Sequence, residues 1–193
     1  MSSMCHAYAT GTHAARDRHP RFREETHQKD EPLLKTLVIG IGNPLLGDDG
    51  VGNYVAKLVE KGLPHGLGVD VKEISASGIE LVEEMMGYDT AIVVDAVATN
   101  GRVGTIRRLK PEQLNETIHF TTPHRINFAS AYEFGKLFAS KSMPKKVILY
   151  GIEIKPKTDF SERLSPDVAE AAHLVAARII RDLARIGVNC LNT

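Results

Sequence analysis

The sequence predicts an α/β protein, a three-layer α/β/α sandwich around a largely parallel sheet. Two observations support this fold class. Several short runs are continuously apolar, as in TLVIGIGN and TAIVVDA, which is typical of strands buried on both faces of a parallel sheet. These runs alternate along the chain with segments of helical periodicity. The 193 residues are enough for one domain with a substantial core.

The predicted strands differ in their apolar pattern. Three are continuously apolar, one alternates polar and apolar residues, and one is short and polar, as expected at a sheet edge. The continuously apolar strands are predicted at residues 36–43, 90–96 and 145–154. The alternating strand is predicted at residues 69–75, and the short polar strand at residues 104–109.

The predicted helices cover residues 49–61, 77–86, 123–139 and 165–186. The first has an apolar face of valines and leucine and stops at Gly62. The second begins with the capping box from Ser77 to Glu80. The last begins with Ser165 as N-cap and Pro166 at the first helical position, and Gly187 is expected to end it. Its predicted core face consists of Val168, Ala172, Val175, Ile179 and Leu183.

The first 34 residues differ from the rest of the chain. They are polar and charged and contain four of the eight histidines, His6, His13, His19 and His27. Such a composition buries too little apolar surface to offset the entropy of ordering, so we expect residues 1–34 to form a disordered tail. A metal-loading or partner-docking arm is the alternative. Residues 35–189 are expected to form the single folded domain.

Composition excludes several functional classes. Lys plus Arg and Asp plus Glu both number 24, so nothing in the overall charge indicates a nucleic-acid partner. No apolar run reaches the ~20 residues of a membrane span, and no signal peptide is visible. The two cysteines, Cys5 and Cys190, form no CxxC motif. A disulfide framework is therefore not expected, and the cytoplasm is the expected location.

The glycine loop GIGNPLLGDDGVG follows the first strand and raises the possibility of a dinucleotide site. Gly40 and Gly42 satisfy the first part of a Rossmann fingerprint, but Leu45 stands where its third glycine belongs. Asp48 and Asp49 would oppose a pyrophosphate at the start of the helix. Nucleotide binding, with Asp70 or Glu73 contacting a ribose, is kept as an alternative.

Polar side chains collect where the predicted strands end. Asp48 and Asp49 follow the first strand, Asp95 ends the third, and His124 lies in TTPHR before a helix. In α/β sheets, sites form at the carboxyl ends of the strands. Two carboxylates and an imidazole are plausible ligands for a borderline metal ion. Each of these residues could instead have a purely structural role. For Asp48 we favour such a role, the capping of the following helix.

The sequence resembles the hydrogenase maturation proteases, endopeptidases that complete the large subunit of nickel–iron hydrogenases. The resemblance spans about residues 36–186. It is carried by GIGNPLLGDDGVG, SASGIELVEEMMGYDTAIVVDA, TTPHRINFASAYEF, VILYGIEI and SERLSPDVAEA, in that order.

The resemblance implies a twisted five-stranded sheet and a nickel site formed by Asp49, Asp95 and His124. Some members have Glu at the first of these positions. The implied substrate is a large-subunit precursor that already carries nickel and loses a C-terminal peptide, so the ion is supplied by the substrate. The implied enzyme is a cytoplasmic monomer.

The resemblance leaves the chemistry open. The metal could polarise the scissile carbonyl or activate a water, or a carboxylate such as Asp48 or Asp49 could act as general base. No Ser or Cys nucleophile lies beside a base in the sequence, so covalent catalysis is not expected. A nickel-binding chaperone without protease activity is the remaining alternative, and the hydrogenase served is not specified.

Overall fold

The computed structural model describes residues 34–64, 68–75, 78–111, 128–156 and 160–191. The chain divides into two units, Met1–Glu31 and Pro32–Thr193, and every element below belongs to the second. The predicted tail of residues 1–34 lies almost entirely outside the described residues. Within the described ranges, no helix combines the length and apolarity needed to cross a membrane.

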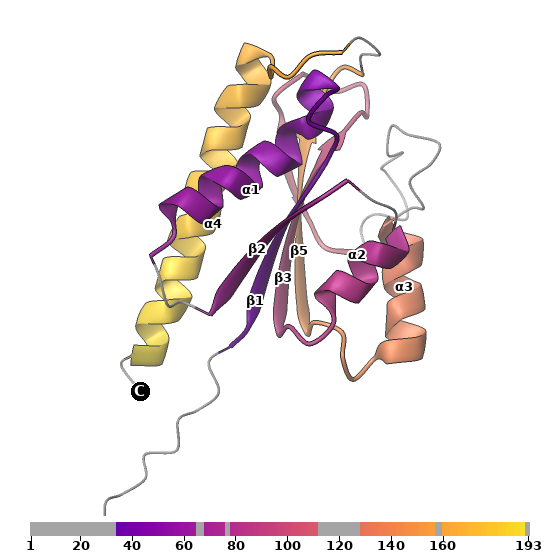
Figure 1. Cartoon of the computed structure of the whole chain (residues 1–193), viewed down its shortest axis with the longest axis vertical. Coiled ribbons are helices and arrows are strands. Elements are labelled where there is room, and N and C mark those ends of the chain that lie inside the picture. Colours follow the sequence, from indigo (N-terminus) through magenta and orange to yellow (C-terminus); the bar gives the residue numbers. More distant parts are fainter. Residues whose placement is uncertain (1–33, 65–67, 76–77, 112–127, 157–159, 192–193) are drawn as a thin grey trace, which may run out of the picture. The chain divides into compact units, whose positions relative to one another are not determined.

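The centre of the fold is a sheet with the strand order β2-β1-β3-β5-β4 (Figure 1). Four strands are parallel, and β4 pairs antiparallel with β5 at one edge. This confirms the predicted α/β class with a mostly parallel five-stranded sheet and the assignment of the short polar strand to an edge. The strands are β1 (Thr36–Ile41), β2 (Val69–Ile74), β3 (Thr90–Val97), β4 (Ile106–Leu109) and β5 (Lys146–Glu153).

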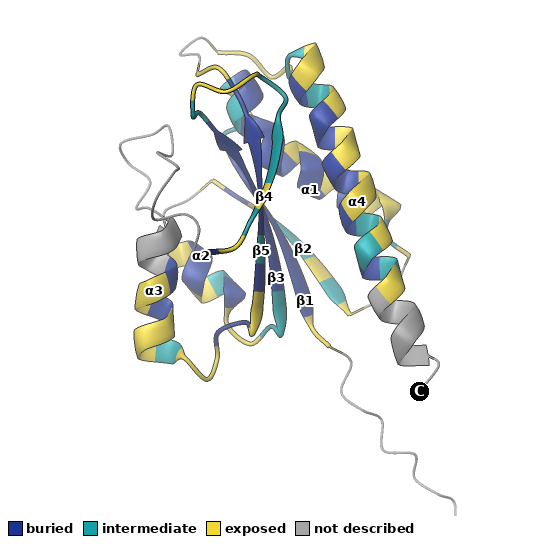
Figure 2. Ribbon diagram, turned by 180° about the vertical axis from the view of Figure 1, so that it is seen from behind, coloured by how far each residue is buried: buried dark blue, intermediate teal, exposed yellow. Residues whose placement is uncertain are grey.

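Helices cover both faces of the sheet, which gives the predicted three layers (Figures 1 and 2). One face packs against α1 and α4, and the other packs against α2 and α3. The helices are α1 (Val51–Gly62), α2 (Gly78–Met85), α3 (Phe128–Ala139) and α4 (Pro166–Leu191).

The core consists of two apolar clusters, one on each face of the sheet. Successive residues of β3 alternate between them: Val93 belongs to the cluster under α2 and α3, and Val94 to the cluster under α1 and α4. Burying each such side chain stabilises the fold by about 1.5–3 kcal/mol. The predicted core face of the last helix is confirmed, since Val168, Ala172, Val175, Ile179 and Leu183 are all buried.

Two predicted helix boundaries are wrong. The first helix was expected from Asp49, but a 3-10 turn, η1 (Gly47–Gly50), comes first and α1 begins at Val51. The last helix was expected to end at Gly187, but α4 continues to Leu191. A glycine inside a helix costs only about 1 kcal/mol, so it does not by itself end one. The predicted starts at Ser77 and Pro123 lie outside the described residues.

Candidate functional site

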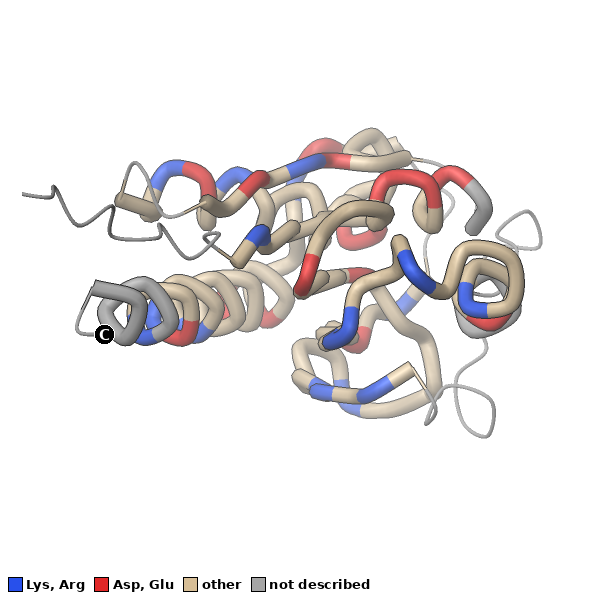
Figure 3. The backbone as a smooth tube through the Cα atoms, turned by 90° about the horizontal axis from the view of Figure 1, so that it is seen from below, with Lys and Arg blue, Asp and Glu red and all other residues tan. Residues whose placement is uncertain are grey.

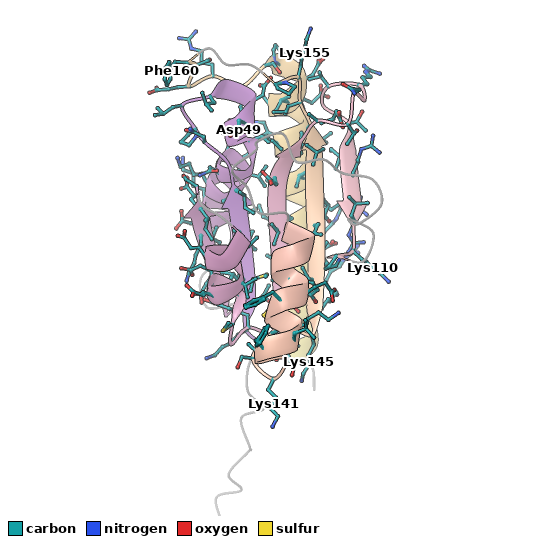
Figure 4. The ribbon with its side chains drawn as sticks, turned by 90° about the vertical axis from the view of Figure 1, so that its right-hand side faces the viewer. Asp49, Lys110, Lys141, Lys145, Lys155 and Phe160 are labelled. Atoms are coloured by element: carbon teal, nitrogen blue, oxygen red, sulfur yellow. The ribbon has the colours of Figure 1, made fainter. Side chains whose placement is uncertain are left out.

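The two loop acids and Asp95 are brought to the same edge of the sheet. β1 and β3 are parallel neighbours, and Gly40 of β1 is in register with Val94 of β3. Asp95 therefore lies at the level where β1 ends and the acidic loop begins. Figure 4 shows Asp49 at this upper end of the sheet. The structure confirms that these residues share the carboxyl edge, where α/β proteins place their sites.

Close packing of glycines holds the acidic loop against the strand ends. A Cβ atom on Gly42 would lie 2.2 Å from the carbonyl oxygen of Asp49. A Cβ atom on Gly52 would lie 2.2 Å from the carbonyl oxygen of Ile41 and 2.4 Å from that of Val94. Only glycine permits these approaches. The first turn of α1 is thereby fixed across the ends of β1 and β3, and this fixes the position of the acids that precede it.

Asp49 is half-buried and turned back over the loop. Its Oδ2 accepts a hydrogen bond from the backbone N–H of Asn43 at 3.0 Å. Asn43 shapes the same turn, because its own Oδ1 accepts a hydrogen bond from the N–H of Leu45 at 3.0 Å. Asn43 therefore sets the path of the loop through both its backbone N–H and its side-chain oxygen.

Asp95 is buried, with 8% of its surface exposed, and its Oδ1 accepts a hydrogen bond from the N–H of Ala96 at 2.8 Å. Because side chains alternate along a strand, Asp95 is on the same face as Val93, the face covered by α2 and α3. The third predicted ligand, His124, lies outside the described residues, four positions before the first residue of α3. Its geometry therefore stays a prediction.

Asp48 has a different role from the one expected. Its carboxylate is buried and its Oδ1 accepts a hydrogen bond from the backbone N–H of Ser165 at 2.6 Å. The predicted capping of the following helix is wrong, because Gly50 is the N-cap of α1 and no side chain caps it. Ser165 takes the predicted N-cap position, since α4 begins at Pro166, but its hydroxyl makes no capping bond: among the described residues it has no hydrogen-bond partner.

The residues that would serve a dinucleotide are engaged elsewhere. Asp70 accepts a hydrogen bond from the hydroxyl of Tyr88 at 2.7 Å, and chiefly this bond raises the pKa of Tyr88 to about 12. Glu73 pairs with Lys57 at 3.2 Å. The loop glycines pack against other backbone segments instead of opening a phosphate cradle. These contacts argue against the nucleotide alternative.

Sequence reasoning missed Glu153, the last residue of β5, which is fully buried at the same edge. Its carboxylate accepts hydrogen bonds from the N–H and hydroxyl of Thr99 at 2.6 and 2.7 Å and from the N–H of Gly101 at 2.8 Å. Burial acts to raise the pKa of Glu153. The bonds from Thr99 and Gly101, with Arg107 at 3.7 Å, outweigh it and lower that pKa.

Glu153 therefore fixes the turn that follows β3, just beyond Asp95. The sequence carried a signal for it, since one acid ends an otherwise apolar strand at the edge where sites form.

Chemically, the carboxyl edge offers carboxylate oxygens that can bind a cation or accept a proton. No group of three or more His, Cys, Asp and Glu side chains suited to a metal ion occurs within the described part of the chain. A three-ligand site thus needs a donor from outside those residues, and His124 is the one that the sequence predicts.

Comparison with protein families gives one match that covers most of the domain. The family model for hydrogenase maturation proteases matches residues 54–182. Hydrogenase 2 maturation protease of Escherichia coli K12 is 24% identical over 160 residues, which cover 82% of this chain and 96% of that protein. A Methanocaldococcus jannaschii protein assigned to the same proteases is 30% identical over 155 residues, covering 77% of this chain and 96% of that one.

Solved structures with the same fold come from proteins of the same description. The hydrogenase maturating endopeptidase HybD of Escherichia coli superposes with a TM-score of 0.60 at 22% identity, covering 78% of this chain and 93% of that one. The [NiFe] hydrogenase maturation protease HycI of Thermococcus kodakarensis gives 0.59 at 20% identity, covering 80% and 95%. At these identities the structural likeness establishes the fold alone.

Proposed function

This chain belongs to the hydrogenase maturation protease family and is a peptidase, and we propose that it removes the C-terminal extension from a nickel-loaded precursor of a nickel–iron hydrogenase large subunit. The observation that supports this proposal is that Asp49, in the turn after β1, and Asp95, near the end of the neighbouring strand β3, lie at the same carboxyl edge of the sheet. A scaffold of buried parallel strands holds both carboxylates in place before any substrate arrives.

We assign nickel recognition to Asp49, Asp95 and His124. Two carboxylates and an imidazole suit a borderline divalent ion, and the two described donors fit this role because both lie at the carboxyl edge. The ion belongs to the substrate, not to the resting enzyme. These three residues bind a precursor that already contains nickel and do not bind one without it. The metal ion therefore signals that nickel insertion into the precursor is complete.

Once the precursor is bound, its ion can supply Lewis-acid assistance at the nearby peptide bond. Asp49 and Asp95 orient the ion, and either carboxylate can take a proton from the attacking water. Asp48 is assigned a positioning role, because its buried carboxylate is bonded to the N–H of Ser165. Its action as general base is the alternative.

The test is processing of the cognate large-subunit precursor, with and without nickel, followed as the loss of its C-terminal peptide. We expect cleavage of the nickel-loaded precursor only, and a loss of at least about 100-fold in Asp49→Ala, Asp95→Ala or His124→Ala, since each removes a ligand. Glu60→Ala, an exposed change on α1, is the matched control and should process normally.

Two results would contradict this assignment. Full activity in the combined Asp49→Ala and Asp95→Ala variant would show that the carboxyl edge is not the site. Tight nickel binding by the enzyme alone, without cleavage of any precursor, would support the nickel-binding chaperone instead. Circular dichroism of each variant separates lost chemistry from lost folding.

A further inference from the structure

Arg107 of β4 lies in the same row of the sheet as Asp95. Both residues are in register with Gly151 of β5, which lies between them. Residues opposite each other on neighbouring strands point to the same face of a sheet. Leu109, two positions after Arg107, packs with the apolar cluster under α2 and α3, the face already assigned to Asp95. The side chains of Arg107 and Asp95 are therefore on one face of the sheet and at one level.

Gly151 leaves the space between these two charged residues free of a side chain of its own. Neighbouring strands lie ~4.8 Å apart, so the backbones at Asp95 and Arg107 are about 10 Å apart across β5. A Cβ atom on Gly151 would lie 2.9 Å from a methyl carbon of Val97, which occupies this place instead. No charged side chain of β5 in this row therefore separates the carboxylate from the guanidinium.

The guanidinium of Arg107 is oriented by two neighbours but keeps donors available. Its Nη2 donates a hydrogen bond to the hydroxyl of Thr99 at 3.1 Å, and its Nε lies 3.7 Å from Oε2 of Glu153. Among the described residues, that Nε has no hydrogen-bond partner. A guanidinium has five N–H donors, and the side chain of Arg107 is 41% exposed. Arg107 can therefore bind a ligand without giving up its bond to Thr99.

Holding the turn after β3 does not account for Arg107. Glu153 already binds that turn through three hydrogen bonds, from the N–H and hydroxyl of Thr99 and from the N–H of Gly101. Arg107 adds one bond to the same hydroxyl, and its 3.7 Å separation from Glu153 is too long for a hydrogen bond. The carboxylate of Glu153 is fully buried, whereas the guanidinium is partly exposed, so a ligand at this edge meets the positive group.

The row from Asp95 to Arg107 presents a negative group and then a positive one. Elsewhere the two kinds of charge are mixed: acidic and basic residues are equal in number, and Figure 3 shows them interspersed along the chain. A complementary ligand has a positive centre opposite Asp95 and a negative group about 10 Å away opposite Arg107. The nickel ion proposed above is such a positive centre, so the precursor is expected to carry the negative group.

We propose that Arg107 is a substrate-binding residue that receives a carboxylate of the hydrogenase large-subunit precursor. This inference rests on the proposed function and adds to it a contact that selects and orients the substrate. The planar fork of a guanidinium pairs with both oxygens of a carboxylate, which makes a carboxylate its best-matched partner. An extended chain rises ~3.3 Å per residue, so about three residues separate this carboxylate from the segment that holds the ion. An acidic side chain or the C-terminal carboxylate of the precursor supplies this group.

The test measures KM and kcat for the cognate nickel-loaded precursor. We expect Arg107→Ala to raise KM on the order of 10-fold with kcat unchanged, because the contact lies away from the reacting atoms. Arg107→Lys keeps the charge but loses the fork and should give an intermediate KM. Arg108→Ala is the matched control on the same strand. Its guanidinium lies 6.0 Å from the centre of the Tyr150 ring on the opposite face, so both constants should stay unchanged.

Altered precursors identify which carboxylate Arg107 binds. Each Asp or Glu near the scissile bond is replaced singly by Asn or Gln. Separately, neutral residues added after the last residue of the precursor move its terminal carboxylate out of reach. We expect one of these precursors to raise the KM of the unaltered enzyme on the order of 10-fold. The same precursor should raise the KM of Arg107→Ala no further, because that variant has already lost the contact.

The outcomes separate a substrate contact from a structural role and from the proposed function. Additive effects of Arg107→Ala with every altered precursor would overturn the inference, because a residue that only holds the turn affects all precursors alike. A wild-type KM in Arg107→Ala would also overturn it and leave the proposed function intact. Should Arg107→Ala fail to fold in a urea titration, Arg107→Lys carries the same comparison. Absence of cleavage by the unaltered enzyme would overturn the proposed function, and this inference with it.

Discussion

The carboxylate of Asp48 accepts a hydrogen bond from the backbone N–H of Ser165 at 2.6 Å, across 117 positions of sequence. A second link lies nearby, because the N–H of Ser161 donates to the carbonyl of Leu45 at 3.0 Å. The acidic loop after β1 and the segment before α4 are therefore joined. Asp48 helps to hold the loop in place through its bond to Ser165. The carboxylate of its neighbour Asp49 instead accepts a hydrogen bond from the N–H of Asn43, just after β1.

This relationship predicts opposite behaviour for the two adjacent acids. Asp48→Asn keeps a side-chain oxygen that can accept the bond from Ser165, so we expect the fold and most of the processing activity to be retained. Asp48→Ala leaves a partly buried N–H without its acceptor and should cost about 1–3 kcal/mol in the free energy of unfolding. Urea titration measures that cost.

Asp49→Asn is the matched comparison. It removes the negative charge from the proposed ligand and should abolish processing, with little change in stability because the residue is only half-buried. If Asp48→Asn were the inactive variant and remained fully folded, Asp48 would be the general base and its assignment here as a positioning residue would be wrong.

Glu153 predicts a pH-dependent contribution to stability. Its folded-state pKa is lowered below the ordinary 4.5, so its stabilising effect is fully present above pH 4.5 and is lost as pH falls through the folded-state pKa. Glu153→Gln should therefore be less stable than wild type at pH 7 by about 1 kcal/mol, and the difference should shrink below pH 4.5.

Glu153→Ala should be more severe, with a cost of about 3 kcal/mol or more. It leaves the N–H of Thr99 and that of Gly101 without their buried acceptor and opens a cavity. Thermal unfolding followed across pH measures both variants. A Glu153→Gln variant whose deficit stays constant down to pH 3 would show that the carboxylate charge is not the cause.

Metal removal distinguishes a resident ion from one carried by the substrate. We expect enzyme that has been treated with a chelator and then desalted to process the nickel-loaded precursor at the untreated rate. The same enzyme preloaded with nickel should leave a nickel-free precursor uncut, because the ion that Asp49 and Asp95 are proposed to recognise is the one already held in the precursor. Processing that depends on nickel added to the enzyme alone would contradict this prediction.

The fold could be predicted from the sequence because its signals are local. Apolar runs such as those of β1 and β3 give strands buried on both faces, and the face of α4 that holds Val168 and Ile179 follows the helical period. The parallel arrangement then places Asp49 and Asp95 at one edge. These inferences need only the order of elements along the chain.

The remainder of the site depends on contacts between distant segments. Ser165 as the partner of Asp48, and Thr99 as the partner of Glu153, are set by how α4 and the β3–β4 turn meet the sheet. No periodicity encodes such pairings. The capping prediction for Asp48 failed for this reason: an aspartate before a helix has a local use, but here a long-range backbone donor occupies its carboxylate.

Gly52 gives the most direct test of how the acidic loop is positioned. A methyl group at this residue would collide with the carbonyl oxygens of Ile41 and Val94, at 2.2 and 2.4 Å, and both belong to the backbone of buried strands. Neither strand can move without breaking hydrogen bonds to its neighbouring strands, so Gly52→Ala should lower the free energy of unfolding by about 3 kcal/mol or more.

Gly87→Ala is the comparison, because its Cβ would meet no atom within 4 Å and only its φ of 83° is unfavourable. That variant should cost about 1 kcal/mol. Equal stability of the two variants in urea titrations would show that α1 does not rest on the strand ends as closely as these contacts indicate.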